Sequence, residues 1–375
     1  MFPGSVLLVI QFPSERRTLF MRVHLVFAAL VINATAVAAA ELQEVASFPD
    51  QQVTGVGVST KSGRVFVNFP YWSDQHSMSV AEIVNGQPKP FPNEEWNKPG
   101  AAASHFVCVQ SVVADDQDNL WVLDPAAPKM KEIVKGGPKL VKIDLLANQV
   151  AQTIPFGEDI APAKSYLNDV RIDTRSETAF ITDSGKGAII VVNLKNGNAR
   201  RLLDGHASTR PEKDFKLVVD GRELIEQQKK APPQIASDGI ALDAKNGYLY
   251  YHALTAHKLY RIKTSFLTDA HLSEKDLESK VENVGQTPAP DGMLESPAGG
   301  IYLTDLEHNA VVHWNAETKS IEQVIADKRL MWPDTLSWDR ITNFMSPHRR
   351  LRTCRVLTTA NPPALSRTSS GKLRK

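Results

Sequence analysis

Cysteine is nearly missing from this chain, which has only Cys108 and Cys354 among 375 residues. A small secreted scaffold built on disulfides needs many more cysteines, so this class is excluded. The ten histidines include no two with the spacing of a zinc site. Cys108 lies in the apolar run FVCVQSVV, and we expect it to be a buried small side chain rather than a ligand or nucleophile.

Long amphipathic helical segments are also missing between the hydrophobic runs, which argues against a parallel α/β fold. The chain has little net charge, formally +1. Residues 340–375 nevertheless hold seven arginines, two lysines and no acid, so the rest of the chain is net acidic. Because an acidic body binds nucleic acid poorly, we expect no nucleic-acid partner.

The N-terminal segment has the features of a secretory signal. Met21 and a following arginine precede an apolar run that ends in small residues, Ala38 and Ala40, before Glu41. Two polar residues inside the run make it short for a membrane anchor, the alternative interpretation. We therefore predict a signal peptide over residues 1–40, with translation possibly starting at Met21, a secreted or periplasmic protein, and no stable membrane insertion after cleavage.

One unit recurs along the chain. Residues 238–262 contain a strand IALDA, a tight turn at Asn246-Gly247, a second strand YLYYHAL and a third strand KLYRI. Residues 291–314 and 169–194 repeat this order, weaker copies begin at residues 55 and 110, and another begins at residue 332. Sheets that recur in this way bury their faces by radial stacking. We predict an all-β fold, a six-bladed β-propeller over residues 41–339.

The pattern fails after Asp339, where residues 340–375 show no alternating strand. Two interpretations remain open: a disordered basic tail, or an aberrant tail caused by a reading-frame change that replaced the end of the last blade. We predict that this blade is incomplete. Between the third and fourth repeats, an insertion over residues 203–234 is expected to cover one face. Ser273 is expected to cap a short outer helix.

Polar residues recur where the innermost and second strands of each blade meet one mouth of the channel. The strand starts carry Gln110, Asn168, Asp169, Asp238, Asp291 and Asp334, and the second-strand ends carry Asp124, Asp183, His252 and Asp305. Carboxylates gathered there require a cation, a cationic ligand, hydrogen-bond donors or raised pKa values. The alternative is that each aspartate only caps its own turn.

Several chemistries suit such a ring. Oxygen ligands from Asn168, Asp238 and Asp291 would suit Ca²⁺ or Mg²⁺, and a bound ion would support a lactone or ester hydrolase. Without an ion, no cofactor is required, and Asp169, Asp238 and Asp291 would hold an organic amine or take a proton in an isomerisation. The remaining predicted ligand contacts are Tyr71 and Trp72 as an aromatic wall, with Asp183, His252, Asp305 and Asp334 around the rim.

The segments RVFVNFPYW, VQSVVADDQDNLWVLD, LNDVRID, DGIALDAKNGYLYYHAL, DGMLESPAGGIYLTD and MWPDTLSWD resemble the major royal jelly protein and yellow family, in a bacterial-type version. This resemblance implies a secreted six-bladed propeller. Members of that family include dopachrome-converting enzymes and salivary proteins that bind biogenic amines in the channel. The resemblance also implies that the last blade should continue beyond Asp339, where this chain departs from the pattern.

The blade starts are more distantly similar to the gluconolactonase and senescence-marker lactonases, whose ion is held by one Glu, two Asn and one Asp. Asn168 and Asp291 match two of these positions, whereas Asp238 replaces the second Asn and no Glu stands at Gly55. Three hypotheses follow: a monomeric binder of a small amine-bearing or aromatic metabolite with possible dopachrome-type isomerase activity, a divalent-metal lactonase, or a non-catalytic interaction module.

Overall fold

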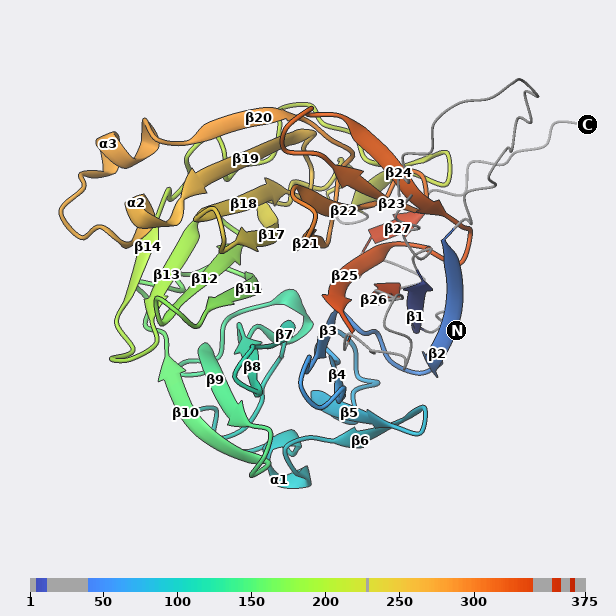
Figure 1. Cartoon of the computed structure of the whole chain (residues 1–375). Coiled ribbons are helices and arrows are strands. Elements are labelled where there is room, and N and C mark those ends of the chain that lie inside the picture. The colour runs from blue at the N-terminus through green and yellow to red at the C-terminus, as the bar shows by residue number, and fades with distance from the viewer. Residues whose placement is uncertain (1–4, 12–39, 227–228, 340–352, 359–364, 368–375) are drawn as a thin grey trace, which may run out of the picture.

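The computed structural model describes residues 5–11, 40–226, 229–339, 353–358 and 365–367. This part of the chain is almost wholly β, as predicted, and Figure 1 shows its sheets arranged radially around a central axis. Its helices are short: α1 (Glu94–Asn97), α2 (Thr264–Thr268), α3 (Glu274–Glu278) and a 3-10 turn η1 (Pro128–Met130). Ser273 caps α3 by accepting a hydrogen bond from the Asp276 N–H, which confirms that prediction.

Five propeller blades each consist of four strands that are consecutive in the chain. In the first two blades the strands are β3 (Gly55–Val58), β4 (Val65–Asn68), β5 (Val80–Val84), β6 (Gln87–Pro90), and β7 (Ser111–Ala114), β8 (Asn119–Asp124), β9 (Lys139–Asp144), β10 (Gln149–Pro155). In the next they are β11 (Leu167–Asp173), β12 (Thr178–Asp183), β13 (Ile189–Asn193) and β14 (Ala199–Leu202). The last two hold β17 (Ser237–Asp243), β18 (Tyr248–Ala253), β19 (Lys258–Lys263), β20 (Glu282–Gln286), and β21 (Met293–Glu295), β22 (Ile301–Asp305), β23 (Ala310–Trp314), β24 (Ile321–Ala326).

The meander of β17, β18 and β19 matches the unit read from the sequence. Gly247 closes the first turn with a φ of 69°, a left-handed conformation that glycine adopts without steric cost. Aromatic side chains of the second strands pack between blades: Tyr250 lies 5.8 Å, centroid to centroid, from Trp314 of the next blade. Both rings are almost completely buried. Burial of such rings is a main source of stability in a stack of sheets.

A further four-stranded sheet joins distant parts of the chain. Its order is β2 (Glu41–Phe48), β1 (Ser5–Gln11), β26 (Thr353–Thr358) and β25 (Pro333–Trp338). Figure 1 shows it between the β3–β6 and β21–β24 blades. Two hydrogen bonds tie it to the first blade: Thr335 Oγ1 donates to the Thr54 carbonyl over 2.6 Å, and the Val58 N–H donates to Ser337 Oγ over 3.2 Å.

This sheet uses segments from both predicted terminal regions. β1 lies within residues 1–40, the predicted signal peptide, whose remaining stretch 12–39 is outside the described residues. β26 and β27 (Leu365–Arg367) lie within residues 340–375, the predicted tail. The proposed cleavage and reading-frame change therefore stay predictions, although short segments of both regions pair with the sheets.

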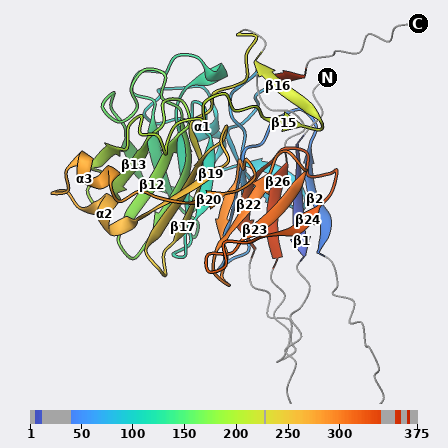
Figure 2. The ribbon, with the colours of Figure 1, turned by 90° about the horizontal axis from the view of Figure 1, so that it is seen from above.

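The insertion between the third and fourth blades forms a cap over one mouth of the channel. Its hairpin, β15 (Val218–Val219) and β16 (Arg222–Glu226), pairs with β27, and Figure 2 shows β16 beyond the blades at one end of the ring. Cap side chains including Leu217 pack on Leu254, Leu306 and Trp332, which come from three different sheets or their ends. The cap thus covers the mouth, as predicted.

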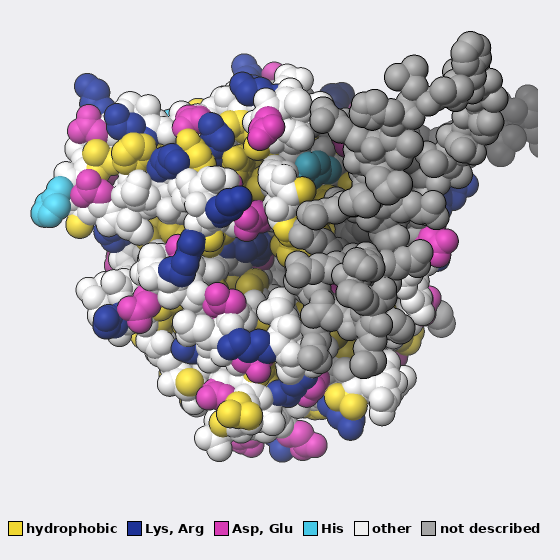
Figure 3. Space-filling view, viewed as in Figure 1, with side chains coloured by type: hydrophobic (Ala, Val, Ile, Leu, Met, Phe, Trp, Pro, Cys, Tyr) yellow, Lys and Arg dark blue, Asp and Glu magenta, His cyan; other side chains and the backbone are white. Residues whose placement is uncertain are grey.

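Two features of the exterior complete the description. Figure 3 shows basic and acidic side chains interspersed over the described part of one face, without a large area of a single sign. No helix within the described ranges is both long and apolar enough to cross a membrane.

Candidate functional site

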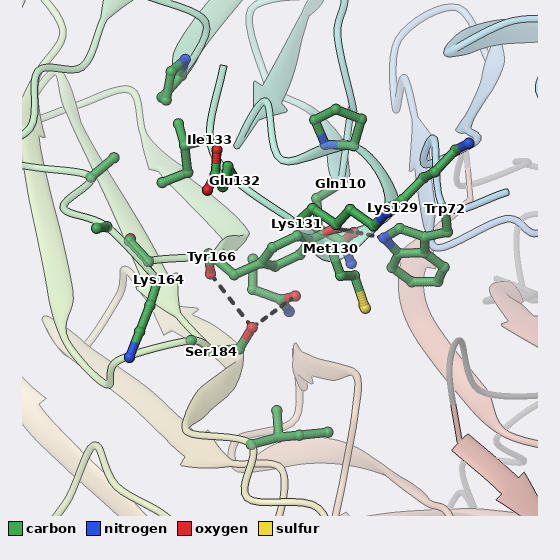
Figure 4. A pocket seen from close by; sticks show the side chains of 18 of the residues that line it. Trp72, Gln110, Lys129, Met130, Lys131, Glu132, Ile133, Lys164, Tyr166 and Ser184 are labelled. Carbon is green, nitrogen blue, oxygen red and sulfur yellow. Dashed lines mark hydrogen bonds between the residues drawn. The ribbon is translucent and has the colours of Figure 1, made fainter. Parts of the chain in front are cut away.

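A cavity of about 1650 Å³ opens at the capped mouth of the channel. Its lining includes six residues that the sequence predicted for ligand or metal contact: Tyr71, Trp72, Asn168, Asp238, Asp291 and Asp334. Figure 4 shows Trp72, Gln110 and Tyr166 close together on one side, and Lys164 and Ser184 elsewhere around the space. Side chains from five different sheets or their connections therefore converge on one cavity.

Irregular pairing at the strand starts directs these acids inward. The registers of β11, β17 and β25 against their neighbours shift just where Asn168, Asp238 and Asp334 occur. Such bulges re-aim a side chain and are frequent beside functional sites. The inner strands are therefore built to present polar groups rather than to continue a regular ladder.

Close packing of the backbone explains why a glycine follows Asp238 and Asp291 in the sequence. A Cβ atom on Gly239 would lie 2.7 Å from the Asp291 carbonyl oxygen, and one on Gly292 would lie 1.7 Å from the Asp334 carbonyl oxygen. Only glycine allows these backbones to approach so closely. Each glycine thus brings the aspartate of the following sheet next to its own, which gathers the acids into a contiguous floor.

Asp238 and Asp291 form a hydrogen-bonded carboxyl pair at the centre of this floor. Burial, followed by the charge of Asp291, raises the pKa of Asp238 well above its usual value. Burial also raises the pKa of Asp291, to about 6, against the hydrogen bond from the Trp332 indole. Asn168 Nδ2 donates to Asp238 Oδ1 over 2.6 Å, and Trp332 Nε1 donates to Asp291 Oδ2 over 2.7 Å. The pKa of both carboxyls is raised, so the pair favours holding one proton between Asp238 and Asp291.

The other two acids of the ring differ in their surroundings. Burial raises the pKa of Asp334 well above its usual value, so it too favours the neutral form. Asp169, predicted as a central residue, does not line the cavity. It accepts a 2.6 Å hydrogen bond from Ser111 and pairs with Arg171 at 3.0 Å. Arg171 also donates to the Met293 carbonyl of a non-adjacent blade and so crosses the channel below the floor.

Three predicted rim residues lie away from the cavity. Asp183 accepts hydrogen bonds from the Gly185 and Lys186 N–H groups of its own turn and from the Tyr166 N–H just before β11, and it pairs with Arg201 at 2.7 Å. Asp305 caps its turn and contacts His308 at 2.8 Å. His252 is fully buried, hydrogen-bonded to Thr287, and burial lowers its pKa to about 4. Asp305 therefore follows the turn-capping alternative, whereas Asp183 and His252 also bond residues outside their own turns.

Sequence reasoning missed three lining residues as ligand contacts: Gln110, Tyr166 and Trp332. Gln110 was recognised only as a strand start. Tyr166 and Trp332 each stand two residues before a polar strand start, Asn168 and Asp334 respectively, and this shared spacing was the available signal. Trp332 has a φ of 49°, a conformation that bulky residues rarely adopt and that marks functional positions.

The side chains of Asn168, Asp238 and Asp291 are poorly arranged to bind a divalent ion. Asn168 presents its amide N–H, not its oxygen, to Asp238, and the oxygens of Asp238 and Asp291 are occupied by each other, Asn168 and Trp332. No group of three or more His, Cys, Asp or Glu within the described ranges could hold a metal ion. The Glu position of the lactonase pattern, Gly55, is also blocked, because a Cβ there would lie 2.1 Å from Asn68 Oδ1.

The fold and cavity define a β-propeller whose channel mouth is lined by buried aspartates, aromatic rings and lysines. The sequence profile described as Major royal jelly protein matches residues 107–356, and the chain belongs to this family. It is 23% identical over 235 residues to Major royal jelly protein 6 of Apis mellifera, covering 60% of this chain and 51% of the relative. It is 24% identical over 240 residues to the Yellow-related salivary protein SP04 of Phlebotomus argentipes, covering 57% and 56%. The chain thus spans about half the length of these relatives.

One solved structure supports the fold at low sequence identity. A chain of the nidogen–laminin complex superposes with a TM-score of 0.53 and 11% identity, covering 89% of this chain and 98% of that chain. A calcium-binding regucalcin from Agrobacterium tumefaciens has a TM-score of 0.47 and 10% identity, covering 80% and 88%.

Proposed function

We propose that this protein binds a small amine-bearing or aromatic metabolite in the channel-mouth cavity, with its ammonium group on the acid floor. The hydrogen bonding of the carboxyl pair supports this most. Asp291 receives hydrogen bonds from Asp238 and Trp332, and the pair keeps one negative charge. A single buried charge beside protonated neighbours suits a monovalent cation better than a divalent one.

The wall of the cavity suits an aromatic body on such a ligand. Tyr71, Trp72, Tyr166 and Trp332 all line it. Faces of such rings attract cations and stack with other aromatic groups. An ammonium group alone would need only the floor, whereas an arylalkylamine would use the floor and the wall together.

An isomerase of the dopachrome-converting type is a second candidate. It is favoured by the same pair, because a carboxylic acid hydrogen-bonded to a carboxylate offers a proton donor and a proton acceptor at one place. Asp291 would take a proton from the substrate and Asp238 would return one. The lactonase alternative has less support, because the carboxyl oxygens of Asp238 and Asp291 already contact other protein groups. Elemental analysis for stoichiometric Ca²⁺ or Mg²⁺ tests it.

We further propose that the β25–β26–β1–β2 sheet is the sixth blade of the ring, which its hydrogen bonds to Thr54 and Val58 support. The protein would act outside the cytoplasm as a monomer, secreted or periplasmic. The predicted signal segment and the membership of a family with a salivary relative support export. Cleavage after Ala40 would remove β1, so the four-stranded sheet describes the uncleaved chain.

Calorimetry with phenethylamine and its neutral analogue phenethyl alcohol tests the proposed function. We expect phenethylamine to bind at pH 7.5, and Asp291→Asn to weaken it at least tenfold, because it removes the charge of the pair. Asp116→Asn, an exposed acid outside the cavity, is the matched control and should leave binding unchanged. Equal affinity of the alcohol and the amine, or full binding by Asp291→Asn, would contradict the proposal.

A further inference from the structure

Gln110 presents to the cavity an amide donor group that bonds to none of the described residues. Its side chain lines the space and is only 7% exposed. The amide oxygen accepts a 2.9 Å hydrogen bond from the Tyr166 hydroxyl, whereas the amide nitrogen has no hydrogen-bond partner among the described residues. A buried amide N–H without a partner is unfavourable unless a ligand or water accepts from it.

The indole N–H of Trp72, which can only donate, determines which end of the Gln110 amide faces the cavity. Trp72 Nε1 can only donate, and it does so to the Tyr166 hydroxyl oxygen over 2.8 Å. The one hydroxyl proton of Tyr166 is then free to be donated onward to the Gln110 oxygen. The chain of donors from Trp72 to Tyr166 to Gln110 therefore leaves the NH₂ group directed at the cavity (Figure 4).

The neighbouring thiol does not compete for that proton. Cys108 is fully buried beside Tyr166, and burial raises the pKa of its thiol to about 12. A neutral thiol is a weak acceptor compared with an amide oxygen. Tyr166 itself stays a neutral phenol, because burial raises its pKa well above the usual value. The direction of the hydrogen bonds from Trp72 to Tyr166 and from Tyr166 to Gln110 therefore does not change around neutral pH.

We propose that Gln110 is a specificity-determining residue that donates hydrogen bonds to an oxygen acceptor on the ligand, so that the cavity selects an arylalkylamine bearing a ring carbonyl or similar oxygen over its unsubstituted counterpart. The amine part of this statement rests on the proposed function; the donor role of Gln110 does not. Gln110 and the acid pair line the same cavity, so the proposal places one ligand against both.

Gln234, which also lines the cavity, differs from Gln110 in that its amide donor is bonded within the protein. Gln234 Nε2 already donates to the Pro233 carbonyl over 3.0 Å. Its donor group is satisfied within the protein, so it has less to offer a ligand than Gln110. Because Gln234 is exposed and its donor group is bonded within the protein, Gln234→Met tests whether the loss of any glutamine from the lining removes the preference.

The test compares isosteric ligands that differ in an acceptor oxygen. Calorimetry measures 4-acetylphenethylamine against 4-isopropylphenethylamine, and ligand-detected NMR measures acetophenone against isopropylbenzene, which have no amine. We expect the ketone to bind about five- to tenfold more tightly within each pair, as one additional neutral hydrogen bond implies. Gln110→Met should abolish the preference, and Trp72→Phe should reduce it, because Tyr166 can then accept from Gln110. Gln234→Met should retain it.

The two ligand pairs separate the proposals. If the ketone preference and its loss in Gln110→Met appear only with the amine-free pair, the role of Gln110 stands and the amine function fails. If neither pair shows a ketone preference, including the case in which no probe binds, or if Gln110→Met retains the preference, the role of Gln110 is overturned.

Discussion

Asp291 keeps its charge in surroundings that disfavour it. Burial raises its pKa from 3.8 to about 6, while Trp332 and Asp238 donate to it and limit the rise. A group whose folded-state pKa is raised binds its proton more tightly in the folded state, so the folded protein loses stability as pH rises from about 4 through 6. The charge of Asp291 thus lowers the stability of the folded protein at neutral pH, a cost that is common at functional sites.

This cost predicts that Asp291→Asn stabilises the protein at pH 7.5. The amide keeps the shape of the side chain without its charge, and a shift of about two pKa units corresponds to about 3 kcal/mol as an upper order of magnitude. Urea unfolding should show a gain at pH 7.5 that shrinks towards pH 4.5, where Asp291 is protonated in the folded protein. Asp116→Asn should show no such pH dependence. An equal effect of Asp291→Asn at both pH values would contradict this account.

The same titration predicts how amine binding depends on pH. An arylalkylamine stays protonated below about pH 10, so the charge of Asp291 decides whether the ammonium finds a partner. Affinity for phenethylamine should be full above pH 7 and fall as pH decreases through about 6. Calorimetry between pH 5 and 8 checks this. A flat profile would show that Asp291 is not the counter-ion.

A buried ion pair at a second-strand end gives a prediction about stability alone. Lys139 Nζ lies 2.8 Å from Asp124, and both side chains are almost completely buried. Because Lys139→Met leaves Asp124 without its counter-charge, it should lower the free energy of unfolding by about 3–5 kcal/mol. Lys195→Met, which breaks the exposed pair with Glu177, should change it by less than about 1 kcal/mol. Denaturant titration measures both, and equal effects would contradict the argument.

The sequence could predict the strand-start acids but not how each is used. Asp238, Asp291 and Asp334 follow from the repeat, because equivalent positions of neighbouring blades converge on one channel. Asp169 occupies an equivalent position, yet it pairs with Arg171, a partner that the repeat does not indicate. His252 ends a second strand like the others, but its burial depends on packing with Thr287 from a later connection.

At the scale of elements, the cap connects the insertion to the acid floor. Leu217 is fully buried and packs in the same cluster as Trp332, whose indole donates to Asp291. The sequence indicated a covering insertion from its length and position. It could not indicate that the cap packs against Trp332, because that contact joins residues more than a hundred positions apart.

Loosening the cap should weaken ligand binding. Leu217→Ala removes buried contacts that hold Trp332, and it should lower phenethylamine affinity several-fold while costing about 2–4 kcal/mol of stability. Leu277→Ala, in the outer helix α3, should cost a similar amount without affecting affinity, since Leu277 is buried in a different cluster. Calorimetry and urea unfolding on both variants check this. Equal loss of affinity would mean that the cap has no specific role.

At the scale of the molecule, the proposed sixth blade takes strands from both ends of the described chain. β26 pairs with β25 on one side and β1 on the other. Repeats read from the sequence predicted the five consecutive blades, because each contains its own strands. The composition of the closing sheet could not be predicted, since residues 5–11 and 353–358 lack the repeated pattern.

Removing residues 340–375 should therefore destabilise the whole ring. The deletion takes away β26 and leaves β25 and β1 without their shared neighbour, so unpaired backbone groups face one another across a gap. We expect the melting temperature to fall by several degrees or cooperative unfolding to be lost. Scanning calorimetry measures this. An unchanged melting temperature would show that β26 contributes nothing to closure.

The most direct test of the account is a crystal structure of the protein with phenethylamine bound at pH 7.5. The ammonium nitrogen should lie within hydrogen-bond distance of Asp291, with the ring against Trp72, Tyr166 or Trp332. An amine bound outside the channel mouth, or a metal ion in place of the amine between Asp238 and Asp291, would contradict it.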